Sequence, residues 1–137
     1  MLQPGRVKTV LKQSRLRLVL VLGGGPPDSD GLLAGLQAHA GFRVLRAIDS
    51  GVAEMLLRES PIALALAWRD AAVEEIESLV AAIRRSGREI PVLAIRAARS
   101  LDAGRWEQLG VAVLREPLLP DALVRSVEVV LGLRKKS

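Results

Sequence analysis

A glycine triplet, Gly23 to Gly25, follows a short apolar run and precedes two prolines and two aspartates. Glycine-rich loops after a strand can bring backbone N–H groups close to a phosphate. A phosphate-binding loop, however, ends in Gly-Lys-Ser/Thr, and a dinucleotide loop needs Gly-x-Gly-x-x-Gly leading into a helix. Here the prolines remove N–H donors, and Asp28 and Asp30 add negative charge where the phosphate would lie. The pattern is therefore only weak evidence for nucleotide binding.

Other chemistry-bearing residues are scarce. The chain has no cysteine, which excludes disulfides and thiolate metal sites, and its one histidine, His39, cannot build a zinc site alone. No general base, nucleophile and metal ligands converge in any one pattern. We therefore predict that the protein is not an enzyme and binds no metal or cofactor.

The elements that would position a site alternate regularly. Apolar runs predict strands over 17–22, 42–48, 62–67, 90–95 and 111–114, and amphipathic runs predict helices over 29–40, 50–60, 71–87, 100–110 and 120–136. Connections of only a few residues favour parallel strands with helices on both faces, a single doubly wound sheet. Reactive groups in such sheets gather where the strands end, here at Gly23 to Gly25, Ala67 to Asp70, Arg96, and Arg115 to Glu116.

The length of 137 residues suits one domain, and the hydrophobic fraction of 50% suffices for a substantial core. Aromatic residues make up 2%, too few for the stacking platforms of single-strand nucleic-acid binders. No apolar run approaches a membrane span, and the basic N-terminus lacks the apolar core of a signal peptide. We predict a cytoplasmic protein.

The net charge of +5 comes from the two ends of the chain. The first 17 residues contain no acid and these bases: Arg6, Lys8, Lys12, Arg15 and Arg17. Arg134, Lys135 and Lys136 follow at the other end. We divide the chain into a basic arm over 1–16 and a domain over 17–134. Such an arm can bind nucleic acid or anionic lipid, but a solvated terminus or linker is the favoured interpretation.

Four segments together resemble the CheY-like receiver domains of bacterial response regulators. They are RLVLVLGGGP (17–26), HAGFRVLRAIDSGVAEMLLRESP (39–61), REIPVLAIRA (88–97) and LGVAVLREPLLPDALVRSV (109–127). Their order and spacing resemble those of the family over about residues 16 to 134. The resemblance implies a flavodoxin-like α/β fold with five parallel strands in the order 2-1-3-4-5.

The resemblance also locates the positions of the family's phosphorylation chemistry. The Mg²⁺-binding acid pair, the phosphoacceptor aspartate, the hydroxyl residue and the lysine correspond to Gly23 with Gly24, Ala67, Arg96 and Glu116. Every position is replaced. Glycine offers no carboxylate to a cation that needs oxygen ligands, and alanine has no nucleophile. We predict a pseudo-receiver that has lost aspartyl phosphorylation.

Two of these substitutions are complementary in charge. Arg96 and Glu116 follow neighbouring strands, so we predict an ion pair between them, with Asp70 as a further partner, across the emptied pocket. The alternative is that both side chains point to solvent. Trp68, directly after Ala67, is expected to have a packing role, and the alternative is that it folds over the emptied pocket.

With phosphorylation lost, the resemblance implies a role in two-component signalling through protein–protein interaction. The surface that receivers commonly use corresponds here to Trp106, Val113, Arg115, Arg125 and Glu128. Trp106 fits a binding role or a core role equally well. Expected partners are a histidine kinase, another regulator, or a second copy in a homodimer through this face. A small-ligand or nucleotide-binding crevice at the strand ends, and nucleic-acid binding through the arm, remain as alternatives.

Overall fold

The computed structural model describes residues 16–23, 31–97 and 103–133. Its strands are β1 (Arg17–Leu22), β2 (Phe42–Ala47), β3 (Ile62–Ala67), β4 (Val92–Arg96) and β5 (Val111–Arg115). Its helices are α2 (Leu32–Gln37), α3 (Ser50–Glu59), α4 (Val73–Ser86), α5 (Ala103–Leu109) and α6 (Pro120–Val130). No helix within these ranges is long and apolar enough to span a membrane.

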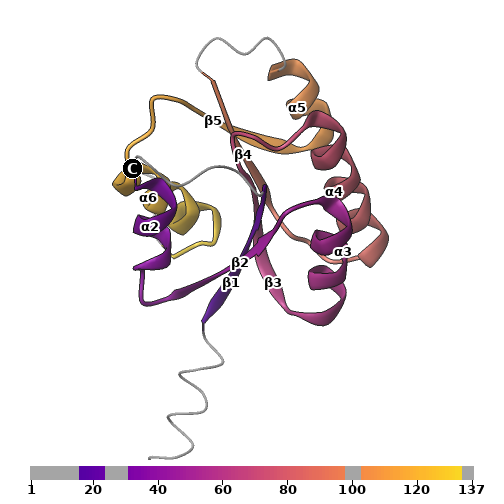
Figure 1. Cartoon of the computed structure of the whole chain (residues 1–137), viewed down its shortest axis with the longest axis horizontal. Coiled ribbons are helices and arrows are strands. Elements are labelled where there is room, and N and C mark those ends of the chain that lie inside the picture. Colours follow the sequence, from indigo (N-terminus) through magenta and orange to yellow (C-terminus); the bar gives the residue numbers. More distant parts are fainter. Residues whose placement is uncertain (1–15, 24–30, 98–102, 134–137) are drawn as a thin grey trace, which may run out of the picture.

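All strand pairs are parallel, and the strands lie in the order β2-β1-β3-β4-β5. Figure 1 shows α2 and α6 on one face of the sheet and α3, α4 and α5 on the other. The predicted doubly wound sheet and its strand order are confirmed. Because the strands run the same way, their carboxyl ends meet along one edge.

The core consists of two apolar layers, one on each face of the central strands. Along β1, Leu20 and Leu22 pack toward α3 and α4, whereas Val19 and Val21 pack toward α2 and α6. Side chains alternate in this way because successive residues of a strand point to opposite faces. The continuous apolar sequences of β1 and β3 follow from burial on both faces.

Helix ends are set by local chemistry. The Asp49 side chain accepts a hydrogen bond of 2.9 Å from the backbone N–H of Val52, which caps α3. Helix α4 ends at Gly87, whose φ of +72° lies in the left-handed region that glycine adopts without strain. These ends fix the loops that lie at the two edges of the sheet.

Candidate functional site

The carboxyl edge of the sheet brings together the positions singled out in the sequence. Gly23 directly follows β1, Ala67 ends β3, Arg96 ends β4 and Glu116 directly follows β5. Gly24 lies outside the described residues. The strands, rather than any local motif, therefore assemble this edge from four separate segments.

Gly23 is held in a conformation that excludes a side chain. Its φ is +132°, and a β-carbon built there would lie 2.7 Å from Oδ1 of Asp70 and 3.0 Å from Cβ of Trp68. Its N–H donates to the carbonyl of Ala47 at 2.8 Å, and its carbonyl accepts from Nη2 of Arg46 at 3.1 Å. The Asp70 carboxylate thus fills the space that a side chain at position 23 would need.

Ala67 and Trp68 are both part of the core. Ala67 is fully buried and packs on the α3–α4 side of the sheet, so the end of β3 presents a methyl group. Trp68 points the other way, is 4% exposed and packs in the α2–α6 layer. Its backbone N–H donates to the carbonyl of Leu22 at 2.9 Å. Packing, one of the two roles expected for Trp68, is the one that the structure shows.

Arg96 joins three elements at this edge. Its Nη1 donates to the carbonyl of Ala71, in the β3–α4 loop, at 3.1 Å. Its guanidinium carbon lies 5.2 Å from the ring centroid of Trp106 in α5, within the range of a cation–π interaction. One side chain therefore connects the end of β4 to the β3–α4 loop and to α5.

Glu116 pairs with Arg69 and not with Arg96, so the predicted ion pair between Arg96 and Glu116 was wrong. Oε2 of Glu116 lies 3.7 Å from Nη1 of Arg69, whose guanidinium carbon is 5.4 Å from the ring centroid of Trp68. Across the described ranges, no ion pair within 4.0 Å joins Arg96 to Glu116 or to Asp70. The β3–α4 loop is therefore tied to the β5–α6 connection through an arginine that the sequence analysis did not consider.

Side-chain alternation explains this difference. Arg96 is the register partner of Arg115 on β5, and paired residues of neighbouring strands project to the same face. Glu116, one residue later, projects to the other face, where Trp68 and Arg69 lie. The prediction that Arg96 and Glu116 lie at the ends of adjacent strands was correct, but their side chains project to opposite faces of the sheet.

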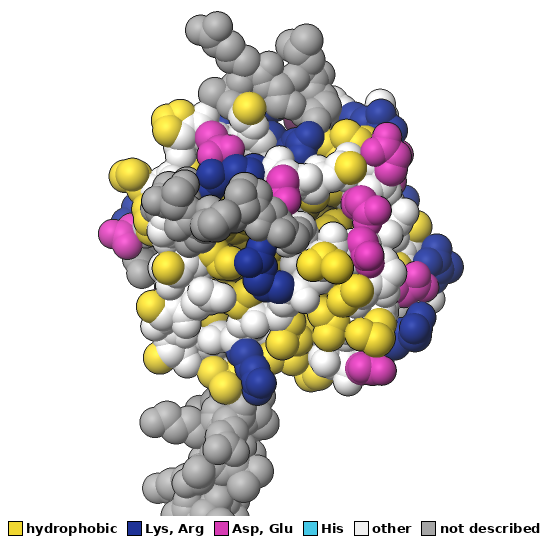
Figure 2. Space-filling view, in the orientation of Figure 1, with side chains coloured by type: hydrophobic (Ala, Val, Ile, Leu, Met, Phe, Trp, Pro, Cys, Tyr) yellow, Lys and Arg dark blue, Asp and Glu magenta, His cyan; other side chains and the backbone are white. Residues whose placement is uncertain are grey.

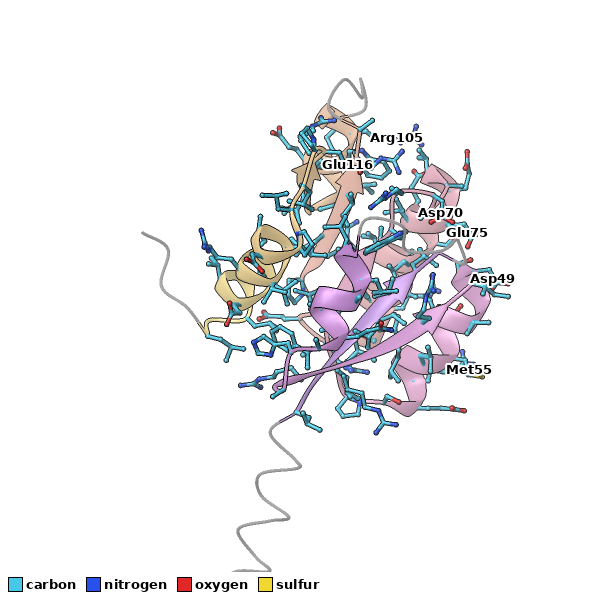
Figure 3. The ribbon with its side chains drawn as sticks, turned by 60° about the vertical axis from the view of Figure 1, so that its left-hand side comes forward. Asp49, Met55, Asp70, Glu75, Arg105 and Glu116 are labelled. Atoms are coloured by element: carbon cyan, nitrogen blue, oxygen red, sulfur yellow. The ribbon has the colours of Figure 1, made fainter. Side chains whose placement is uncertain are left out.

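The remaining carboxylates of this edge lie on the α3–α4 side. Figure 3 shows Asp70 and Glu75 close together, Asp49 below them, and Glu116 separately near β5. Glu75 accepts a hydrogen bond from the backbone N–H of Ser50. Within the described segments, no group of three or more histidine or acidic side chains is arranged to hold a metal ion. Both Asp49 and Glu75 thus contribute hydrogen bonds to the start of α3.

A small pocket of about 170 Å³ opens beside these carboxylates. It is lined by Leu22, Gly23, Ile48, Asp70, Ala71, Ala72 and Glu75. Small-molecule sites usually enclose roughly 300–1,000 Å³ and bury most of the ligand. Ligand binding at the strand ends stays a prediction, as does nucleic-acid binding through the arm, which lies outside the described residues.

The comparisons with known proteins identify the fold. No family model and no curated protein matches the chain. Among solved structures it is similar to a signal receiver domain from Mycobacterium tuberculosis, with 21% identity over 88% of this chain and 99% of that one, at a TM-score of 0.72. It is also similar to a CheY-like response regulator receiver domain protein from Methanospirillum hungatei, with 20% identity, 85% and 94% coverage and a TM-score of 0.69. A Francisella response regulator receiver domain gives 18% identity, 85% and 97% coverage and a TM-score of 0.66.

The chain has the receiver-domain fold. The likeness predicted from the four sequence segments is thereby confirmed for the fold and its strand order.

Trp106 cannot serve as a contact for a partner on this fold. Its side chain is completely buried in the α3–α4 layer of the core, beneath the Arg96 guanidinium. Within the described part of the chain, its indole N–H has no hydrogen-bond acceptor. Of the two roles weighed for Trp106, the binding role was wrong, because the short helix α5 turns this tryptophan toward the sheet.

The other predicted contact residues keep varying degrees of exposure. Val113 and Arg115 are half-buried on β5, where Arg115 donates to the carbonyl of Ala97 at 3.0 Å. Arg125 is exposed on α6. Oε2 of Glu128 lies 3.5 Å from Nε2 of His39, which follows α2. Arg125 and Glu128 line a groove between α6 and α2, whereas Val113 and Arg115 project from β5 toward the side of the sheet that carries α5. These four residues, here called the β5–α6 surface, therefore extend around the β5 edge of the sheet, and their role as an interface stays a prediction.

Proposed function

We propose that this chain is a receiver-like signalling module that does not accept a phosphoryl group and acts by binding another protein. The observation that carries the proposal is Ala67, a fully buried methyl group where the receiver pattern calls for the phosphoacceptor. Aspartyl phosphorylation needs a carboxylate nucleophile and oxygen ligands for Mg²⁺. Gly23 supplies no side-chain oxygen, and its carbonyl already accepts from Arg46.

The arginine contacts support a single, fixed arrangement of the loops. Arg96 connects β4, the β3–α4 loop and α5, and Arg69 connects the same loop to Glu116. In a working receiver the phosphoryl group would organise these loops. Here protein side chains hold the loops without a phosphoryl group, so the β5–α6 surface would be available to a partner at all times and not only after phosphorylation.

A protein partner is the occupant that best suits the β5–α6 surface. Strand β5 lies at an edge of the sheet, and α6, the next helix in the chain, presents the exposed Arg125 beside Glu128. Exposed and half-buried side chains of both charges are typical of the rim of a protein interface. A histidine kinase, another regulator or a second copy of the chain are the partner classes that we propose.

The chemical half of the proposal is tested by incubation with acetyl phosphate and Mg²⁺ followed by intact mass measurement. We expect no added phosphoryl group. A mass gain that disappears in Asp70→Asn would show that Asp70 accepts phosphate and would end the proposal.

The binding half is tested by cross-linking the full chain in cells that produce it and identifying the captured proteins. We expect a kinase, a regulator or a second copy, cross-linked within the β5–α6 surface and lost in Arg125→Glu. Arg43→Glu is the control with the same charge change, because Arg43 is exposed on β2, the outer strand on the opposite side of the sheet from β5. Equal losses in both variants, or cross-links confined to other faces, would contradict an interface at this surface.

A further inference from the structure

A groove of about 390 Å³ lies between α3 and α4, at the opposite edge of the sheet from Gly23 and Ala67. Crossover helices run against the strands, so the last turns of α3 and α4 lie where the strands begin. Figure 1 shows these two helices side by side on one face of the sheet. Leu57 and Ala82, both buried core residues, lie at the base of the groove.

The walls of the groove carry an excess of positive charge. Arg58, Arg85 and Arg88 face a single acid, Glu54. Oε1 of Glu54 lies 3.7 Å from Nη1 of Arg58 and 3.3 Å from Nη2 of Arg85, so one carboxylate oxygen is shared by two guanidinium groups. The two arginine side chains are 68% and 63% exposed. Each guanidinium has five N–H donors, most of which this one oxygen leaves available.

Arg88 has a different, structural role. Its guanidinium donates to the backbone carbonyls of Leu57, Ser60 and Ile62, the last two at 3.1 and 3.4 Å. These bonds hold the end of α3 and the start of β3 against the loop after α4. The position of the groove is therefore fixed, while Arg58 and Arg85 stand at its opening.

We propose that this groove binds an acidic peptide segment of a partner protein. The existing pairing already shows that the two guanidinium groups can converge on one carboxylate, and arginine suits carboxylate oxygens because its N–H donors form a planar fork. Glu54 would act as an internal placeholder that a peptide carboxylate replaces or joins. An open groove with an apolar base between two helices accommodates a chain segment better than it encloses a free anion. This surface is separate from the β5–α6 surface, and the inference does not depend on the loss of phosphorylation.

The test is a fluorescence anisotropy titration of the full chain with a short fluorescein-labelled peptide of repeated Glu-Leu-Gly, at low salt. Arg58→Gln with Arg85→Gln should weaken binding by about fivefold, the size expected for losing two exposed charge pairs. Glu54→Gln should strengthen it by about two- to fivefold, because it removes the internal competitor. A purely structural role for Glu54 would not produce tighter binding.

A matched double variant separates the groove from general charge attraction. Arg43→Gln with Arg105→Gln removes the same charge from exposed positions elsewhere, and we expect binding to change by less than about twofold. Equal weakening by both doubles, or no effect of the Arg58 and Arg85 changes, would overturn the proposal. Thermal unfolding of each variant confirms that it is folded.

Two further measurements distinguish other occupants. If inorganic phosphate binds with the same dependence on Arg58 and Arg85 while the peptide does not, the groove is an anion site and the peptide assignment is wrong. If sedimentation velocity shows self-association that the Arg58 and Arg85 changes abolish, a second copy is the occupant instead. Peptide binding with neither result supports the proposal.

Discussion

Replacing Arg96 with methionine should release the end of β4 from the β3–α4 loop and from α5. The guanidinium lies 3.1 Å from the carbonyl of Ala71 and 5.2 Å from the ring of Trp106. A hydrogen bond from a charged donor contributes about 1.5–3 kcal/mol. A cation–π contact contributes about 0.5–2 kcal/mol. Because Arg96 is only half-buried, solvent reduces both, and we expect Arg96→Met to lower the free energy of unfolding by roughly 1–3 kcal/mol.

Urea unfolding followed by tryptophan fluorescence measures this change. Trp106 should report it directly, since its emission depends on the cation above its ring. Arg43→Met removes an equally charged but exposed side chain on β2 and should change stability by less than about 0.5 kcal/mol. If Arg96→Met changes the free energy of unfolding as little as the control does, the guanidinium does not hold the carboxyl ends of the strands together, and the reasoning is refuted.

Three other substitutions follow from the packing. Trp106→Ala should cost about 3–5 kcal/mol in urea unfolding, because it empties a fully buried site; a loss under 1 kcal/mol would place the indole outside the core. Gly23→Asp should lower the free energy of unfolding by about 1–3 kcal/mol from its positive φ alone. Gly104→Asp is the control and should be near neutral, because no atom lies within 4 Å of a β-carbon built there. Equal losses of stability in the two variants would contradict the strain argument. Arg88→Met should cost about 1–3 kcal/mol in thermal unfolding, and an unchanged midpoint would show that the three carbonyls do not need it.

Much of the fold could be predicted because its strands are marked by unbroken apolar runs. The ranges 17–22 and 62–67 coincide with β1 and β3. Strands buried on both faces are recognised from such runs because both sets of alternating side chains lie in the core. Once these strands are placed, the positions of Gly23 and Ala67 at the carboxyl edge follow from the parallel arrangement alone.

The side-chain partners at the site were harder to predict. Arg69 lies in a loop, where no periodicity indicates the direction of a side chain. Its pairing with Glu116 could therefore not be predicted from the sequence. The separation of Arg96 from Glu116 follows from strand alternation, but only after the register with Arg115 is known. Trp106 lies in a helix of seven residues, too short for a pattern that would reveal its inner face.

We propose that the carboxyl edge of this sheet keeps the receiver scaffold without a phosphoacceptor. The most direct test is a set of ¹H–¹⁵N NMR spectra of the full chain, recorded with and without Mg²⁺ and beryllofluoride, which mimics a bound phosphoryl group. We predict that the amide signals of Gly23, Ala67, Arg96 and Glu116 stay unchanged. Saturable shifts of these signals would contradict the claim.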